Sequence, residues 1–137
     1  GVTVTNNSTD ELLAHKAIQW DVLVYTPEKQ AFSADADVER CKRVAPVAKE
    51  VREMALDGRY QQAMTVNGFA FCAALGFSPE PMIEMLPDVE GVSLSGTGPS
   101  FTAVGDQEVL EAVRINWDER EGHTWLTTTE TRGAQII

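Results

Sequence analysis

The sequence contains few residues of the kinds that build metal centres or disulfide frameworks. Only two cysteines and two histidines occur among its 137 residues. Cys41 and Cys72 are far apart and form no Cys-x-x-Cys pair, so we expect both to be free thiols in the core. With His15 and His123 as the only imidazoles, a histidine-rich metal site is disfavoured, and we predict no metal site in this chain.

Long apolar runs and clusters of basic residues are also missing. No run approaches the roughly 20 apolar residues that a transmembrane helix needs, and the N-terminal segment lacks the layout of a signal peptide. Acidic side chains outnumber basic ones by 21 to 11, giving a formal net charge of -10, whereas nucleic-acid binders concentrate Lys and Arg. We therefore expect a cytoplasmic protein that binds neither a membrane nor a nucleic acid.

The acidic residues are dispersed along the chain, and only four lysines accompany them. This composition is typical of proteins from salt-rich cytoplasms, where net charge maintains hydration, and ordinary acidic proteins share it in weaker form. The length suits one domain of about 100–150 residues, and an apolar content of 43% supplies an ordinary core. Because the chain starts with Gly1 in a strand-like pattern, without an initiator Met, we expect a fragment of a longer protein.

Hydrophobic periodicity predicts strands and helices in alternation. The predicted strands are 2–5, 21–25, 89–95, 101–104 and 123–129. A helix is predicted from Val38 to a stop at Gly58, with Ser33, Asp35 or Asp37 as its N-cap. The other predicted helices are 59–76, 79–86 and 109–113. From residue 21 onward this order favours an α+β fold, a ferredoxin-like α/β sandwich whose antiparallel sheet carries helices on one face.

Two residues in the predicted helix 59–76 conflict with its apolar surroundings. Asn67 needs hydrogen-bond partners when buried, and Gly68 costs about 1 kcal/mol relative to Ala in the middle of a helix. One interpretation is that Gly68 permits close packing while Asn67 caps a neighbouring backbone group. The other is that both lie near a substrate, which makes Asn67 a candidate substrate contact.

One segment suggests chemistry: the stretch between two predicted strands that reads SGTGPS, residues 95–100. Two glycines let backbone N–H groups point into a common concavity, and such nests attract phosphate oxygens. Hydroxyl donors are added by Ser95, Thr97 and Ser100. The segment lacks the Gly-Lys-Ser/Thr of a phosphate loop and the third glycine of a dinucleotide fingerprint. The simpler alternative is a tight connection between adjacent strands, where Gly and Pro are common.

Longer strings resemble a known family. The string GVSLSGTGPSFTAVGD, residues 91–106, resembles the third motif of the GHMP kinase superfamily, a Gly-rich loop between two strands of the C-terminal domain. Three other strings resemble the archaeal shikimate kinases of that superfamily, in their halophilic form: AMTVNGFAFCAALGFSPEPMIEML (63–86), FSADADV (32–38) and TTTETRGA (127–134). The resemblance covers nearly the whole chain, in order.

The resemblance implies a reaction and a division of labour. Members transfer the γ-phosphoryl group of ATP, with Mg²⁺, onto a small alcohol. In archaeal shikimate kinases this alcohol is the 3-hydroxyl of shikimate, in aromatic amino-acid (chorismate) biosynthesis. The active site lies between an N-terminal and a C-terminal domain, and the ATP-binding motif Pro-x-x-x-Gly-Leu-Gly-Ser-Ser-Ala belongs to the former. That motif does not occur here, so the catalytic residues are unknown and expected in the missing N-terminal half.

The third motif is the part of the family pattern that this sequence carries. The resemblance implies that five residues lie close to the phosphates or the substrate: Ser95, Gly96, Thr97, Gly98 and Ser100. Arg132 is a candidate partner for a substrate carboxylate, and an ordinary surface ion pair is the alternative. The resemblance also implies that residues 1–20 are a residual strand and linker from the N-terminal domain, and that residues 21–137 form the C-terminal domain.

We therefore expect the C-terminal part of a shikimate kinase, inactive alone, that binds ATP and Mg²⁺ mainly through its missing half. Its expected partners are shikimate and its own N-terminal domain. Two alternatives stay open. One is another GHMP kinase, acting on homoserine or mevalonate, and the other is a ferredoxin-like ligand-binding module without catalysis.

Overall fold

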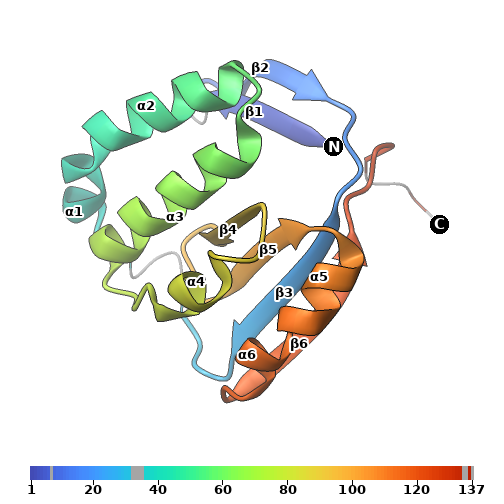
Figure 1. Ribbon diagram of the computed structural model, residues 1–137. Helices are drawn as coiled ribbons and strands as arrows, with labels where there is room; N and C mark the ends of the chain where they lie inside the picture. The colour runs from blue at the N-terminus through green and yellow to red at the C-terminus, as the bar shows by residue number, and fades with distance from the viewer. Residues whose placement is uncertain (7, 32–35, 134–135, 137) are drawn as a thin grey trace.

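The computed structural model describes residues 1–6, 8–31, 36–133 and 136, which form two antiparallel sheets and six helices (Figure 1). The strands are β1 (Val2–Asn6), β2 (Glu11–Lys16), β3 (Asp21–Pro27), β4 (Gly91–Leu94), β5 (Phe101–Gly105) and β6 (Gly122–Thr128). The helices are α1 (Val38–Arg43), α2 (Ala45–Leu56), α3 (Tyr60–Leu75), α4 (Glu80–Met85), α5 (Gln107–Val113) and α6 (Ile115–Asp118). Strands β1 and β2 form a separate hairpin.

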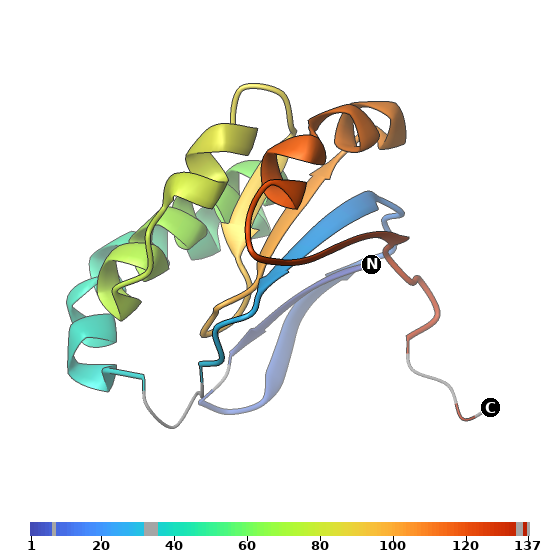
Figure 2. The ribbon, with the colours of Figure 1, turned by 90° about the horizontal axis from the view of Figure 1, so that it is seen from below.

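The larger sheet contains four antiparallel strands in the order β4-β5-β3-β6. From β3 onward, with the helices between β3 and β4 taken as one crossover, the chain follows a β-α-β-β-α-β pattern. The predicted ferredoxin-like α/β sandwich is confirmed. Figure 2 shows α5 and α6 on one side of this sheet and the β1–β2 hairpin on the other side.

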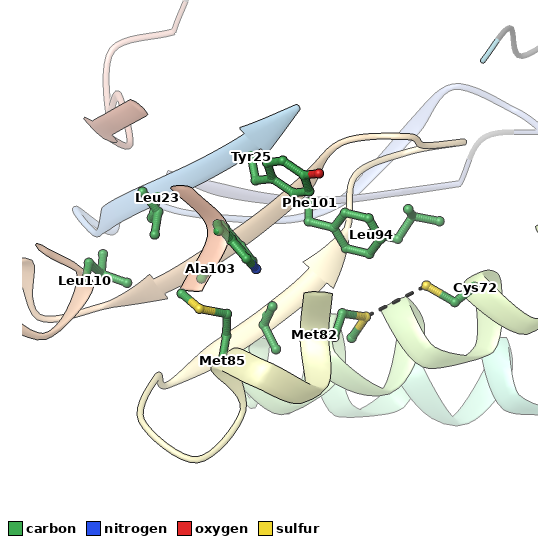
Figure 3. Packing of buried hydrophobic residues seen from close by; sticks show 11 residues of the cluster. Leu23, Tyr25, Cys72, Met82, Met85, Leu94, Phe101, Ala103 and Leu110 are labelled. Carbon is green, nitrogen blue, oxygen red and sulfur yellow. Dashed lines mark hydrogen bonds between the residues drawn. The ribbon is translucent and has the colours of Figure 1, made fainter. Parts of the chain in front are cut away.

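The core lies between the larger sheet and the helices α3, α4, α5 and α6, and α3 contributes the buried Cys72 (Figure 3). Leu23 in β3 and Trp117 in α6 are fully buried, and Trp117 packs at 5.7 Å between ring centroids on Tyr25. The indole N–H of Trp117 donates a 2.9 Å hydrogen bond to the carbonyl of Pro81, so its polar atom is satisfied inside the core. This arrangement ties α4 and α6 to the same strand.

Helix α3 runs along β4, and the two approach very closely. The backbone N–H of Val92 donates a 3.1 Å hydrogen bond to the hydroxyl of Thr65. A methyl group added to Gly68 would lie 2.7 Å from Cε of Met82 and 2.8 Å from Cα of Ser93, closer than real side chains approach. The close-packing interpretation of Gly68 therefore holds, because only glycine lets the helix reach the strand.

The predicted single helix from Val38 to Gly58 was wrong. The structure has two helices, α1 and α2, which meet at Val44. Pro46 lies in the first turn of α2, where its missing N–H costs nothing, but inside a continuous helix its ring would clash with the carbonyl of Lys42. Pro46 therefore sets the boundary that the apolar periodicity did not reveal.

Asp37 is the N-cap of α1, as one of the predicted alternatives had it. Its side chain accepts a 3.0 Å hydrogen bond from the backbone N–H of Arg40. The other two candidates, Ser33 and Asp35, lie outside the described residues.

Two short elements were missed by the sequence prediction. Strand β2 contains the consecutive apolar residues Leu12, Leu13 and Ala14 and lacks regular alternation, and a bulge interrupts its pairing with β1. Helix α6 is a single turn, too short for helical periodicity to develop. Among the described residues, no helix combines the length and apolar character needed to cross a bilayer.

Candidate functional site

The glycine loop, residues 95–100, connects β4 to β5, as predicted. The backbone N–H of Ser95 donates to the carbonyl of Ser100 at 2.8 Å, and the N–H of Gly98 donates to the carbonyl of Ser95 at 2.9 Å. Gly96 and Gly98 have φ angles of 56° and 77°, in the left-handed region that glycine adopts without penalty. The two glycines are therefore required by the turn itself.

These hydrogen bonds reduce the number of backbone N–H groups in the loop that are available to a ligand, compared with the predicted nest. The N–H of Gly98 was expected to face a ligand, but it is used inside the loop. Among the described residues, the N–H of Gly96 has no acceptor and can donate to a ligand oxygen. Ser95 and Thr97 are exposed at the end of the loop, whereas the hydroxyl of Ser100 lies 2.8 Å from that of Thr26. Thr26 thus fixes the loop to the end of β3.

A cavity of about 330 Å³ lies beside the loop. Thr97 lines it together with the end of α3 and the segment that leads into α1, and two cations, Lys29 and Arg40, are among its lining residues. The guanidinium of Arg40 donates a 2.7 Å hydrogen bond to the carbonyl of Ala73 near the end of α3. Asp37, the N-cap of α1, also lines the cavity, so the two cations exceed the acidic charge of the described lining residues by one. In a chain with a net charge of -10, this local excess of positive charge next to the loop favours an anionic ligand.

Asn67 lies in a different part of the structure. It lines a mostly apolar groove of about 240 Å³ between β1 and the helices α2 and α3, next to Val4 and Tyr60. Asn67 precedes the end of α3 at Gly76 by nine residues, which is about 13 Å along a helix. No described residue hydrogen-bonds to its side chain, so the predicted backbone cap is not seen within the described part of the chain.

Arg132 lies at the far end of the sheet from the loop. Its side chain is exposed, and its Nε is 3.6 Å from a carboxylate oxygen of Glu130. The preceding Thr129 hydrogen-bonds to Trp20 at the start of β3, whereas the loop is attached to Thr26 near the end of β3. Six residues of strand separate these two points by about 20 Å. The structure therefore does not bring Asn67, Arg132 and the loop together.

The groups with shifted pKa values do not line the cavity beside the loop. Burial raises the pKa of the Cys72 thiol to about 11 and also raises the pKa of Tyr25, whose hydroxyl donates to the carbonyl of Glu121 at 3.0 Å. The pKa of Arg120 is raised mainly by its hydrogen-bonded pairing with Glu84. These shifts belong to structural contacts away from the cavity.

The backbone hydrogen bonds of residues 131 and 132 lower the pKa of Glu130 at the surface. Both cysteines are free thiols, and Cys72 is buried as expected while Cys41 is half-buried. Within the described residues, no three His, Cys, Asp or Glu side chains are close enough to hold a metal ion. These residues therefore provide no carboxylate cluster suited to Mg²⁺.

Sequence reasoning located the loop but missed the residues around it. The sequence analysis gave no role to Thr26 or Lys29, and it included Phe77 only as a member of the string 63–86. The three come from segments far from the loop in sequence, and only the fold brings them to it.

The chain is similar in sequence to archaeal proteins named shikimate kinase. It is 50% identical to the one from Halobacterium salinarum over 98% of this chain and 48% of that protein. It is 41% identical to the one from Methanocella arvoryzae over 100% of this chain and 48% of that protein. The chain thus spans about half the length of the curated relatives it matches. No protein-family model matches it.

Solved structures share the fold at low sequence identity. The mevalonate kinase of L. major, in complex with R-mevalonate, superposes with a TM-score of 0.56 over 85% of this chain and 44% of its own, at 15% identity. A putative homoserine kinase from Listeria monocytogenes gives 0.56 over 93% of this chain and 47% of its own, at 13% identity.

Proposed function

The chain belongs to the archaeal shikimate kinases of the GHMP kinase superfamily, and from this premise we propose that it forms the C-terminal half of a shikimate kinase. The full-length protein would transfer the γ-phosphoryl group of ATP to the 3-hydroxyl of shikimate. One observation carries the proposal: half of the residues are identical, over 98% of the chain, to a protein named shikimate kinase.

In this proposal the glycine loop borders the phosphoryl groups. Phosphoryl transfer depends on positioning and on stabilisation of charge, so donors from two halves of a protein can converge on the same phosphates. The N–H of Gly96, which has no acceptor among the described residues, and the exposed hydroxyl of Ser95 would donate to phosphate or substrate oxygens, and Thr97 would border them at the cavity. Gly98 and Ser100 would shape the loop, since the N–H of Gly98 and the hydroxyl and carbonyl of Ser100 are already paired.

The N-terminal half of the full-length protein would supply the ATP-binding and catalytic groups that the described residues lack. ATP and Mg²⁺ would bind mainly there, and the catalytic residues would lie there too. Lys29 and Arg40 are the cations best placed on this side to attract an anionic substrate, because they line the cavity that Thr97 also lines. A substrate contact by Asn67 or Arg132 would require the substrate to reach other surfaces, so we rank both behind the loop.

We also propose the division of the chain at residue 20. Residues 1–20 would contribute the β1–β2 hairpin to the N-terminal half, and residues 21–137 would form the C-terminal domain. Support comes from the sheet topology, in which the hairpin does not pair with the four-stranded sheet.

The test is an ADP-release assay on this chain, alone and joined to its upstream half, at high KCl. We expect turnover of shikimate only by the joined protein. Robust turnover by the short chain would refute the division into two halves. Homoserine and mevalonate are assayed in parallel, and preference for either would assign another GHMP kinase. A folded, joined protein that turns over none of the three would favour a ligand-binding module.

Low-identity fold similarity is the only support for the homoserine or mevalonate alternative. At 13–15% identity it establishes the fold and no more, whereas the shikimate assignment rests on 50% identity. Shikimate is therefore the first acceptor to test.

A further inference from the structure

The aromatic ring of Phe77 packs directly against the glycine loop. A methyl group added to Gly98 would lie 2.6 Å from Cε2 and 2.7 Å from Cζ of Phe77, and 3.2 Å from a methyl carbon of Leu94. Real Cβ atoms essentially never approach other atoms to within 3.0 Å. A side chain at Gly98 would therefore collide with the ring of Phe77 and press against Leu94, so there is no space for one.

The position of Phe77 is itself fixed by the end of α3. Gly76 ends the helix in the left-handed conformation, with φ of 78°. The backbone N–H groups of Gly76 and Phe77 both donate to the carbonyl of Cys72, at 2.9 and 3.0 Å. Cys72 is buried in the core, and Phe77 packs against the same cluster. The ring is thus held by the core and presented to the loop.

The two glycines of the loop have different surroundings. Gly98 contacts Phe77, whereas a methyl group on Gly96 would meet nothing within 4 Å. The side of the loop at Gly98 is packed against protein, and the side at Gly96, with its free N–H, faces open space. A loop that is fixed on one side and open on the other can present a donor in a constant direction.

Phe77 also lies between two cavities. It lines the cavity of about 330 Å³ that holds Thr97, and it lines a second cavity of about 170 Å³ next to Pro99 and Phe101. Lys29 borders both. Removal of the ring would enlarge the space next to the loop and take away its contact with Gly98.

We propose that Phe77 is a positioning residue that holds the glycine loop in its ligand-binding conformation. The proposal rests on the proposed kinase function. A loop that is already ordered before its ligand arrives loses little conformational entropy on binding. The entropic cost of binding is therefore smaller, and the ligand binds more tightly through the same contacts. Small misplacements of a positioning group reduce phosphoryl-transfer rates strongly. Phe77 would therefore act on turnover without touching the reacting atoms.

The first test compares Phe77→Leu with Phe71→Leu in the full-length protein. Phe71 lies on α3, is half-buried against the same core and lines neither cavity, so it is a matched control. We expect Phe77→Leu to lower kcat/KM for ATP at least about tenfold, while Phe71→Leu leaves it within about twofold. Equal losses for the two variants, measured at equal folded fractions, would overturn the proposal.

A second readout does not depend on catalysis. The N–H of Gly98 is hydrogen-bonded inside the loop, so its hydrogen exchange reports loop order directly. We expect Phe77→Leu to accelerate exchange at Gly98 at least about tenfold and Phe71→Leu to leave it unchanged. Unchanged exchange in Phe77→Leu would overturn the proposal. Absence of shikimate turnover by the wild type, with accelerated exchange in Phe77→Leu, would count against the kinase function alone.

A double-mutant cycle isolates the contact. Gly98→Ala has two costs, the left-handed backbone and the clash with the ring, whereas Gly96→Ala has only the first. In a Phe77→Ala background the clash with the ring is gone, and the 3.2 Å contact with Leu94 remains. We therefore expect Gly98→Ala to reduce kcat by a smaller factor in that background than in the wild type, and Gly96→Ala by the same factor in both. An unchanged factor for Gly98→Ala would show that the ring does not position the loop.

Discussion

The two sheets of this protein are built from the same antiparallel pairing but differ in what covers them. In the four-stranded sheet, Leu23, Val92 and Ala103 are fully buried beneath helices. In the β1–β2 hairpin none of the described residues is buried, and Leu12 is 58% exposed. Backbone pairing alone does not make a stable sheet, because an isolated hairpin is marginal without a packed face.

The hairpin has one apolar contact surface, and it is incomplete. Val4 faces the groove of about 240 Å³, whose walls include Trp20 and Tyr60 in an edge-to-face contact at 6.2 Å between ring centroids. This partial cover agrees with the proposal that residues 1–20 belong to a sheet completed by the other half of the protein. Truncations at matched positions test how far the two sheets differ, and changes at Gly68 and Cys72 test the packing of the covered sheet.

The largest effect is expected from Trp117→Ala in the core of the four-stranded sheet. Loss of this fully buried side chain leaves a cavity and removes its hydrogen bond to the carbonyl of Pro81, and we expect the free energy of unfolding to fall by about 3–5 kcal/mol. The control is Leu12→Ala in the hairpin, where we expect a change below about 0.5 kcal/mol. Urea denaturation of the chain at fixed KCl measures both. Similar losses of unfolding free energy for the two variants would mean that Leu12 is packed in a hydrophobic core formed by the hairpin.

Gly68→Ala is expected to have the next largest effect. Alanine favours a helix by about 1 kcal/mol, but the added methyl would clash with the backbone of Ser93, which cannot rotate away. We expect a net loss of about 1–3 kcal/mol in the same assay. Gly105→Ala is the matched control, because the nearest atom to its added methyl is 3.5 Å away, at ordinary contact distance. A stabilising Gly68→Ala would show that α3 can move away from β4 at little cost.

Burial of Cys72 predicts that stability falls in alkaline solution. The thiol has an ordinary pKa of 9.0, which burial raises to about 11 in the folded protein. Between these values the unfolded chain binds fewer protons than the folded one, so the free energy of unfolding falls by up to about 1.4 kcal/mol per pH unit. Urea denaturation between pH 8 and about 10.5 measures the slope. Cys72→Ala should flatten it, and an unchanged slope in that variant would assign the pH dependence to other groups.

The smallest effect is expected from Val4→Ala in the hairpin. Val22→Ala makes the same change in β3, where the side chain is only 9% exposed, and should cost about 2 kcal/mol. For the half-buried Val4 we expect less than about 1 kcal/mol in the chain alone. In the full-length protein the two costs should converge, because the other half covers the hairpin. A persistent difference there would count against the division at residue 20.

Local patterns predicted the elements that depend on local physics. Alternating residues indicated both strands around the glycine loop, and Gly76 indicated the end of α3, because side-chain direction and backbone freedom are properties of short segments. Pro46 was a local signal too, and its neglect produced the one wrong helix. The hairpin partner of β1 was missed because apolar neighbours in β2 give no alternation.

The candidate site was predictable only in part, for a different reason. The family resemblance located residues 95–100, but the contacts that shape them come from Thr26 and Phe77, which are distant in sequence. A residue's type does not reveal which distant segment the fold will bring to it. Asn67 and Arg132 illustrate the reverse case, since each suggested ligand chemistry and each lies away from the loop.

On the outer edge of each border strand of the four-stranded sheet, a side chain hydrogen-bonds to the backbone where a further strand would otherwise pair. Thr65 accepts the N–H of Val92 on β4, and Arg114 donates a 3.0 Å hydrogen bond to the carbonyl of Thr124 on β6. Unpaired strand edges are the usual starting points for polymerisation of chains into aggregates. By occupying one acceptor or donor position at each border, these two side chains make it harder for a second molecule to extend the sheet.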